Sequence, residues 1–355
     1  MYPKVSLLWI NYNSIDIKEI VIESIKSINE LNYPNFELIV VDGGSTDGST
    51  DFVEKLLKKS RIHHKFLRQK ENLGQQSSWN LAYLAMSKDT KYFMTLDNDV
   101  KLYPNSLKEV VERLEQDENI GSLSGIELYW NSKDVANAGI MFDELLFGNT
   151  LCQGLNVKEC EKNEHLISAA SGGLGIYRTS AIRRLGKNLF EADMIRHFNE
   201  TILGARLWTK GYKTIFFPVI VGEHHRWATA TSRSLKRFYY KQRGWLTLLL
   251  ISNSPLRNST TQNLFLLKNL FGYIRRDPKN SLEYVKMHRK VIADSEKKAR
   301  ELLRRKISVD INKIPHVKGI RLFWLFPAGW TKKFQSSSRF ADLLRKNSIY
   351  FPALV

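Results

Sequence analysis

Two carboxylates separated by a single residue, Asp97 and Asp99, are the side chains best suited to chemistry in this sequence. They follow the apolar run Tyr92–Leu96, which predicts a buried strand. Carboxylates at this spacing can converge on a hard divalent cation, which prefers oxygen ligands. A cation held there would neutralise a diphosphate and stabilise its departure as a leaving group. The same residues are also typical of turns, where they accept hydrogen bonds from backbone N–H groups. Their position at the end of a predicted strand favours the metal site over a simple turn.

Polar residues follow two earlier apolar runs in the same way. Asn11 and Asn13 come after Val5–Ile10, and the acid-, hydroxyl- and glycine-rich loop Asp42–Ser49 follows the next strand-like run. In parallel sheets, ligands bind beyond the carboxyl ends of the strands, so three polar ends predict one crevice. Glycines in the loop permit close backbone approach to a ligand, and Asp42 is placed to accept hydrogen bonds from a nucleobase or ribose. A simple helix cap at the end of the loop is compatible with the same residues.

The segments that must position these residues alternate between strand-like and helix-like patterns, which is typical of an α/β fold with a parallel sheet. The predicted strands are Val5–Ile10, Phe36–Val41, His64–Leu67, Tyr92–Leu96, Ile120–Ile126 and Thr214–Val221. The predicted helices in this part of the chain cover residues 21–31, 51–58, 75–86, 107–114, 179–185 and 199–209. Residues 130–164 show no clear period, so we expect an elaborated loop region there.

The composition is that of a globular protein, but its charge is uneven. The chain has 355 residues, of which 43% are hydrophobic and 25% charged, and this argues against a disordered or disulfide-stapled chain. Residues 1–229 hold 27 Lys and Arg against 29 Asp and Glu, whereas residues 230–355 hold 27 against 7. The whole formal charge of +18 therefore comes from the last third. Such a division indicates that the two parts meet different partners.

The basic last third is predicted to be helical, over residues 238–251, 263–276 and 282–306. Residues 263–276 and 320–330 combine aromatic and aliphatic side chains with Lys and Arg, which favours the headgroup region of an anionic membrane. We therefore expect peripheral membrane contact through residues 260–335. A solvated appendage that packs on the rest of the protein is the alternative. We expect no nucleic-acid partner, because no DNA- or RNA-binding signature accompanies the charge.

The cysteines and the hydropathy both point to the cytoplasm. Cys152 and Cys160 fit no zinc-binding pattern and are too few for a disulfide framework, so we expect two free thiols in a reducing compartment. No stretch reaches the ~18–20 apolar residues of a membrane span. The first apolar run is too short for a signal peptide. A cytoplasmic protein on the inner face of the cell membrane is the predicted location.

Taken together and in order, these motifs resemble those of the family 2 glycosyltransferases of the GT-A fold. The motifs are Asn11-Tyr12-Asn13, Val41–Ser49, Glu71–Gly74 before a helix carrying Asn80, Leu96–Asp99, Ser171-Gly172-Gly173 and Phe190–Gly211, followed by His224. The resemblance covers roughly residues 4–230. Beyond it, Phe238–Arg243 is similar to the Tyr- and Arg-rich segment of rhamnosyltransferase-like members.

The resemblance implies a fold, an activity and a domain division. The fold would be a Rossmann-like GT-A domain with a mostly parallel sheet at residues 1–230, followed by a helical basic region at residues 231–355. The activity would be inverting transfer of a hexosyl or deoxyhexosyl group from a nucleotide-sugar donor to a saccharide acceptor, with a lipid-linked acceptor as one option. The product would be a cell-surface glycan or glycoprotein.

The resemblance also implies roles for individual residues. The donor would be bound by Asn11, Asn13, Asp42, Asn72, Gly74 and Asp97. A Mn²⁺ or Mg²⁺ ion would be held by Asp99, Asp97 and His224, with His225 as the alternative imidazole. The acceptor would meet Gly172, Gly173 and Glu191.

The catalytic base is the place where the sequence departs from the family pattern. Glu200 stands where the family has an aspartate, while Asn199 and Ile202 replace two further acids. The extra methylene shifts the reach of the carboxylate by about 1 Å, which matters because a base must lie within hydrogen-bond reach of the acceptor hydroxyl. Glu191 and Asp193 are the alternative bases.

Two other classes stay open. A sugar-1-phosphate nucleotidyltransferase would carry a Gly-rich, Arg- or Lys-containing phosphate loop after the first strand, where this chain has Asn11-Tyr12-Asn13-Ser14. A non-catalytic glycan- or nucleotide-binding relative is compatible with the substitutions at Asn199 and Ile202.

Overall fold

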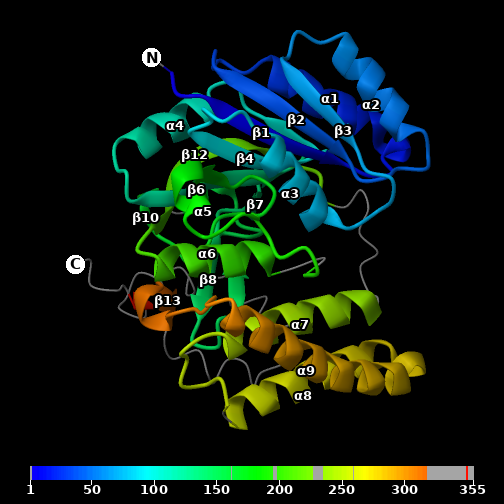
Figure 1. Cartoon of the computed structure of the whole chain (residues 1–355), viewed down its shortest axis with the longest axis vertical. Coiled ribbons are helices and arrows are strands. Elements are labelled where there is room, and N and C mark those ends of the chain that lie inside the picture. The colour runs from blue at the N-terminus through cyan, green and yellow to red at the C-terminus, as the bar shows by residue number, and fades with distance from the viewer. Residues whose placement is uncertain are drawn as a thin grey trace.

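The computed structural model describes residues 2–160, 162–194, 198–226, 235–258, 260–317 and 349–350. A large twisted sheet with helices on its faces forms one part of the molecule, and a layer of long helices lies at some distance from that sheet (Figure 1). Among the described residues, no helix combines the length and apolar character needed to cross a membrane.

The large sheet is mixed, with a parallel centre. Its strands are β1 (Val5–Asn11), β2 (Phe36–Asp42), β3 (His64–Arg68), β4 (Tyr92–Asp97), β5 (Val100–Leu102), β6 (Ile120–Tyr129), β7 (Val135–Asn137), β10 (His165–Leu166), β11 (Ile176–Arg178) and β12 (Lys213–His224). The order is β10-β12-β6-β11-β4-β1-β2-β3, with β5 paired to β12 and β7 to β6. β1 runs parallel to both β2 and β4, in a register that places Asn11 beside Asp42 and Ile10 beside Asp97. The predicted meeting of three polar strand ends is therefore confirmed.

Helices cover this sheet and bury its apolar side chains. They are α1 (Lys18–Asn29), α2 (Ser49–Lys58), α3 (Gln75–Ala85), α4 (Ser106–Glu115), α5 (Thr179–Arg183) and α6 (Asn199–Thr209), with short 3-10 turns η1 (Ile15–Ile17) and η2 (Val157–Glu159). Each predicted helix of this part is present, and the apolar residues that recur every three or four positions face the core. In α4, for example, Leu107, Val110 and Leu114 are fully buried.

Residues 130–164 are more ordered than the sequence predicted. They contain β7, β8 (Ile140–Asp143) and β9 (Gly148–Thr150). β8 and β9 form a hairpin in a second sheet, in which β13 (His316–Val317) pairs in parallel with β8 and β14 (Ile349–Tyr350) pairs with β13. The loop prediction was wrong here. Strands of three or four residues are too short to show a period, and they pair with a segment more than 150 residues away.

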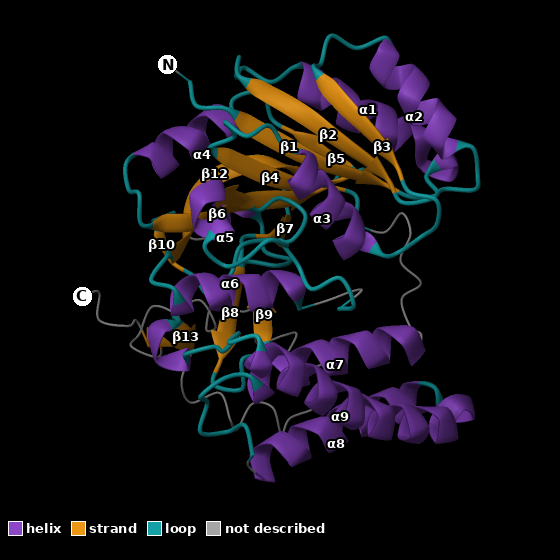
Figure 2. Cartoon of the chain, viewed as in Figure 1, coloured by secondary structure: helices purple, strands orange, loops and turns teal. Residues whose placement is uncertain are grey.

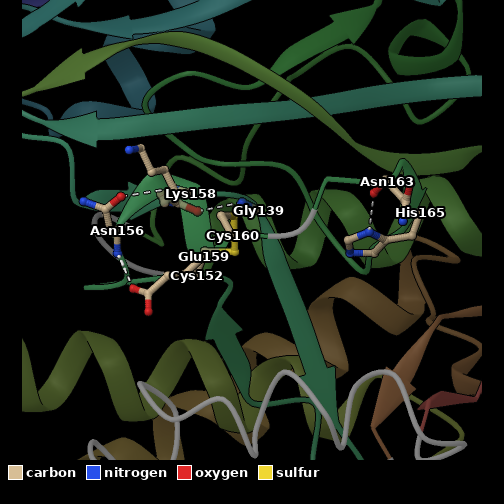
Figure 3. The surroundings of a disulfide bond; sticks show 9 residues. Gly139, Cys152, Asn156, Lys158, Glu159, Cys160, Asn163 and His165 are labelled. Atoms are coloured by element: carbon tan, nitrogen blue, oxygen red, sulfur yellow. Dashed lines mark hydrogen bonds between the residues drawn. A yellow bond between two sulfur atoms is a disulfide. The ribbon is translucent and has the colours of Figure 1, made fainter.

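The two cysteines form a disulfide, so the prediction of free thiols was also wrong (Figure 3). The chain between Cys152 and Cys160 folds back through η2, which brings their Cα atoms to 5.5 Å. Asn156 caps η2 by accepting a hydrogen bond from the backbone of Lys158. Nothing in the spacing of the cysteines reveals this turn.

The last third forms three long helices, as predicted: α7 (Leu235–Leu250), α8 (Thr260–Arg276) and α9 (Ser281–Arg304), with short turns η3 (Pro278–Asn280) and η4 (Ile311–Lys313). They form a layer below α6 and the β8–β9 hairpin (Figure 2). A shared apolar core joins them to that hairpin and to α6, and Trp245 donates a hydrogen bond from its indole to the carbonyl of Leu145. The division into domains at residue 230 stays a prediction. The aromatic and basic stretch at 320–330 lies outside the described residues.

Candidate active site

The ends of β4 and β12 bring two carboxylates and one imidazole together. Nε2 of His224 lies 3.0 Å from Oδ1 of Asp99 and 3.8 Å from Oδ2 of Asp97. One ligand atom from each of the three residues lies within 4.8 Å of the other two. The cause is topological: β12 pairs antiparallel with β5, which places His224 opposite Val100, the residue after Asp99. His224 is more than 120 residues from Asp97 and Asp99 in the sequence, and strand pairing in the sheet brings the three side chains together.

Glu127 completes the group and was missed by the sequence reasoning. It lies in β6 next to β12, and its carboxylate is 2.9 Å from Nδ1 of His224. A histidine that binds a metal usually donates its other ring N–H to a carboxylate, which fixes the tautomer and the ring orientation. Ser171 donates a hydrogen bond of 2.9 Å to the second oxygen of Glu127. The signal that marks Glu127 is a carboxylate inside an otherwise apolar strand.

The electrostatics of this group favour a cation. Burial alone would lower the pKa of His224, but the carboxylates of Glu127 and Asp99 outweigh it and raise that pKa to about 10. Burial raises the pKa of Asp97 to about 6, with Asp99 adding to the effect and His224 opposing it. Three carboxylates thus surround one imidazole in a buried site. The donor set fits a divalent metal ion, with Asp97, Asp99 and His224 as its ligands. Such an ion would supply positive charge to a diphosphate.

His225, the alternative imidazole, makes other contacts. Its backbone N–H donates a hydrogen bond of 3.0 Å to the carbonyl oxygen of Asp99, which helps to hold the loop of the carboxylates. Its ring packs edge-on to Trp130, with ring centres 6.1 Å apart. Among the described residues, the metal-ligand group contains His224 and does not contain His225.

A hydrogen-bonded network joins the ends of β1, β2 and β4. Asn11 donates to the carboxylate of Asp42 at 2.9 Å, and Asn98 donates to the side-chain oxygen of Asn11 at 2.9 Å. The other oxygen of Asp42 accepts from the backbone N–H of Ser45 at 2.9 Å. Asn13 accepts from the backbone of Thr46. These contacts hold the loop after β2 in one shape beside Asp97 and Asp99.

The start of α3 reaches the same place. Asn72 accepts a hydrogen bond of 2.8 Å from the backbone of Gly74, whose φ of +89° favours glycine. The next residue, Gln75, donates a hydrogen bond of 2.9 Å to Asp97. Gln75 was not identified from the sequence, because no pattern distinguishes it from other polar residues at a helix start.

Glu200 and the metal-ligand group lie beside two adjacent glycines. A Cβ atom at Gly172 would lie 3.6 Å from the carboxyl carbon of Glu200, and one at Gly173 would lie 3.1 Å from Oδ2 of Asp97. A side chain at Gly173 would therefore intrude on the metal ligands. Burial raises the pKa of Glu200, and the charge of Asp97 adds to this. Glu200 is thus a half-buried carboxylate with an increased affinity for a proton.

Glu191 and Asp193, the alternative bases, are held by cations of the last third. Glu191 accepts from Arg305 at 2.8 Å and from Lys298 at 3.2 Å. Asp193 lies 2.8 Å from a guanidinium nitrogen of Arg243 and 2.9 Å from the Lys298 ammonium. These contacts overcome the effect of burial and lower the pKa of both carboxylates, which reduces their strength as bases.

This arrangement agrees with the comparison with known protein families. The sequence profile described as glycosyl transferase family 2 matches residues 6–185, about half of the chain. The chain belongs to this family. The matched region holds the three polar strand ends, Glu127 and the glycine pair. The nucleotidyltransferase alternative is thereby set aside, whereas the rhamnosyltransferase-like branch stays a prediction.

Individual relatives align with this chain over only part of their length. An uncharacterized glycosyltransferase of Haemophilus influenzae is 32% identical over 121 residues, which make up 34% of this chain and 36% of the relative. Poly-beta-1,6-N-acetyl-D-glucosamine synthase of Staphylococcus aureus is 21% identical over 59% of this chain and 46% of its own. The chain thus matches less than half the length of these relatives.

The fold is shared with glycosyltransferases of known structure. The mannosyltransferase PcManGT of Pyrobaculum calidifontis, solved in complex with GDP-Man and Mn²⁺, superposes with a TM-score of 0.53 at 15% identity. The match covers 98% of this chain and 87% of that one. The GT-A fold predicted from the sequence is confirmed, including helices after the catalytic sheet.

Proposed function

We propose that this protein is an inverting, metal-dependent glycosyltransferase with Glu200 as its catalytic base. The observation that supports the proposal is that Glu200 lies beside Gly172, while Asp97 and His224 of the metal-ligand group lie beside the adjacent Gly173. A base and a site for the leaving group, held close together by the fold, are the parts that an in-line displacement needs.

In the proposed reaction, Glu200 accepts the proton of an acceptor hydroxyl as its oxygen attacks the anomeric carbon of the donor sugar. The new bond forms on the face opposite the nucleoside diphosphate, whose bond to the sugar breaks at the same time. The proton later leaves Glu200 for solvent. The raised pKa of Glu200 suits this role, because a base works best when its pKa approaches the working pH.

The donor is proposed to be a nucleotide sugar that carries a hexosyl or deoxyhexosyl group, lying over Asn11, Asn13 and Asp42. The acceptor is proposed to be a saccharide, either free or linked to a lipid. The product of the transfer would be part of a cell-surface glycan or glycoprotein. The likeness to a polysaccharide synthase over 59% of this chain supports this direction.

Peripheral contact with a membrane is proposed through the outer side of α8. Leu264, Leu267 and Phe271 recur at helical spacing on that side and are exposed, Phe271 to 65%. Arg275 and Arg276 follow at the end of the helix. Apolar side chains with cations beside them suit an anionic membrane surface. Flotation with phosphatidylglycerol vesicles tests this: Phe271→Ser should reduce recovery, and Leu303→Ser, an exposed leucine on α9, should not.

The disulfide gives a test of the proposed location on the cytoplasmic face. The structure pairs Cys152 with Cys160, and disulfides persist mainly in oxidising compartments. Maleimide labelling of protein from freshly lysed cells measures the state of the two cysteines. Labelling of both would support the cytoplasmic face, whereas protection of both would place the protein in an oxidising compartment.

Hydrolysis of a nucleotide-sugar donor distinguishes an enzyme from a non-catalytic relative. The full chain should release the nucleoside diphosphate from a matching donor slowly, and only with a divalent metal present. Donor binding without any metal-dependent hydrolysis or transfer, across a panel of nucleotide sugars, would identify a non-catalytic binding protein. Thermal stabilisation by donor plus metal selects the donor for this assay.

A further inference from the structure

A buried asparagine on α3 holds the segment that leads to the proposed base. The side-chain N–H of Asn80 donates a hydrogen bond of 2.9 Å to the carbonyl oxygen of Phe190, and its side-chain oxygen accepts one of 2.8 Å from the N–H of the same residue. Both residues are buried, and 110 residues separate them in the sequence. Trp79, the residue before Asn80, lies with its ring centre 5.5 Å from that of Phe190. Two directed hydrogen bonds and one ring contact thus attach this segment to α3.

A short series of hydrogen bonds continues from Phe190 to the first turn of α6. The backbone N–H of Met194 donates a hydrogen bond of 3.0 Å to the carbonyl oxygen of Glu191, which closes a turn directly after Phe190. The side chain of Asn199 then donates a hydrogen bond of 2.6 Å to the carbonyl oxygen of Met194. Asn199 is 2% exposed and precedes Glu200 at the start of α6. A deprotonated acid in its place would have no proton to donate to this carbonyl. The start of α6 is therefore attached to the turn that α3 holds.

The metal side of the site is fixed by other contacts. Asp97 ends β4, and Thr95 of the same strand donates a hydrogen bond of 2.8 Å to the carbonyl oxygen of Gly172. Gln75, in the first turn of α3, donates its hydrogen bond to Asp97. Because a helix rises by about 1.5 Å per residue, Gln75 and Asn80 are about 7.5 Å apart along α3. Loss of the Asn80 amide would leave the contacts on the metal side in place.

We propose that Asn80 is a positioning residue for the transfer reaction, which sets the place of the Glu200 carboxylate relative to the metal-ligand group. This rests on the proposed function and adds to it a residue that acts through the backbone of Phe190. A base must meet the acceptor hydroxyl within hydrogen-bond distance. A displacement of about 1 Å at such a site can reduce turnover by about 10²-fold.

Turnover measured in two backgrounds tests the proposal. Asn80→Ala suits a helix, because alanine has the highest helix propensity, but it removes both hydrogen bonds to Phe190. We expect it to reduce the turnover number by about tenfold or more, with the metal concentration at half-maximal turnover unchanged. In the Glu200→Gln background, the same substitution should reduce turnover by less than about twofold, because the group that it positions is already lost.

Asn253→Ala is the matched control. Asn253 also joins two segments through both atoms of its amide, since it donates to Asp310 at 2.7 Å and accepts from the backbone of Ile311 at 2.8 Å. Its removal should leave turnover at the wild-type level. Asn80→Asp is a second variant for the case that Asn80→Ala does not fold. It keeps the size and the acceptor oxygen but cannot donate to the carbonyl of Phe190, so turnover should decrease here too. Binding of donor plus metal, followed by thermal stabilisation, gives the folded fraction of each variant.

The outcomes separate this inference from the proposed function. If Glu200→Gln turns over normally, the proposed function fails and this inference fails with it. If Glu200→Gln loses turnover and folded Asn80→Ala does not, this inference alone fails. Equal losses from Asn80→Ala in both backgrounds, or a higher metal requirement, would also overturn it, because Asn80 would then act on the whole fold or on the metal site. A loss confined to the wild-type background, at an unchanged metal requirement, is the expected result.

Discussion

The molecule has two charged regions that are built differently. Acidic side chains gather at the strand ends, and basic side chains gather on the last three helices. Asp97 and Glu127 lie in β4 and β6, Asp99 lies in the turn between β4 and β5, and the three surround a single imidazole, that of His224. The cations lie on helices, and they divide into two kinds. Some, such as Lys298, hold acids of the first part of the chain, while others, such as Arg275 and Arg276, lie at the end of the exposed face of α8.

This difference changes the meaning of the uneven charge. Residues 230–355 hold 27 basic and 7 acidic residues, which by itself indicates a separate basic surface. Glu191 and Asp193 show that part of this surplus attaches the helices to the rest of the protein. Only the remainder is available for a membrane. The following predictions test this contrast between charges that act in the site and charges that hold it together.

Asp99→Asn should have the largest effect on activity. Loss of one carboxylate from the metal-ligand group should reduce transfer by about 10³-fold or more, because charge stabilisation by a metal contributes several kcal/mol. Turnover as a function of Mn²⁺ concentration measures it. Asp89→Asn, the same substitution at an exposed acid, is the control. Full transfer by Asp99→Asn in excess chelator would refute the metal assignment.

Glu200→Gln should reduce the turnover number by about 10²–10³-fold while donor binding is retained. The base must be deprotonated, so activity should decrease as the pH falls through its pKa. Burial raises that pKa, so the decrease in activity at low pH should occur at a pH above the ordinary pKa range of a glutamate. This decrease should be absent from the pH profile of Glu200→Gln. Near-normal turnover of this variant would instead transfer the role to Glu191 or Asp193.

Glu127→Gln should weaken metal binding by about 10–100-fold and leave the ligands themselves in place. Its carboxylate orients the His224 ring, and an amide accepts the ring proton less strongly. The metal concentration at half-maximal turnover reports this effect. An unchanged metal requirement would mean that Asp97 and Asp99 position the ion without help from β6.

Lys298→Met should have the smallest effect on chemistry and act on stability. It leaves Glu191 and Asp193 with one cation each, and we expect a loss of ~1–3 kcal/mol in the free energy of unfolding. Urea denaturation measures it, with the exposed neighbour Lys297→Met as control. The cations lower the pKa of both carboxylates, so their contribution is present at neutral pH and is lost as the pH falls through those lowered values. An equal pH dependence in Lys298→Met would contradict this attachment.

The sequence was informative where a function needs a local pattern. Asp97 and Asp99 lie two residues apart, the loop after β2 is continuous, and both follow strands that their apolar runs predict. Such patterns are visible because the chemistry and the strand that carries it are adjacent in the chain. The parallel sheet, the helices that cover it and the three helices of the last third were predictable for the same reason.

Tertiary structure decided everything that depends on distant pairing. The register of β12 against β5 selected His224 over His225, and the position of β6 beside β12 brought Glu127 to the imidazole. The β8–β9 hairpin and the pairing of Cys152 with Cys160 have no local signature. The physical reason is that these contacts join segments whose pairing no local pattern encodes, such as Glu127 and His224, which are 97 residues apart in the sequence. The residue types were set by the sequence, and their partners only by the fold.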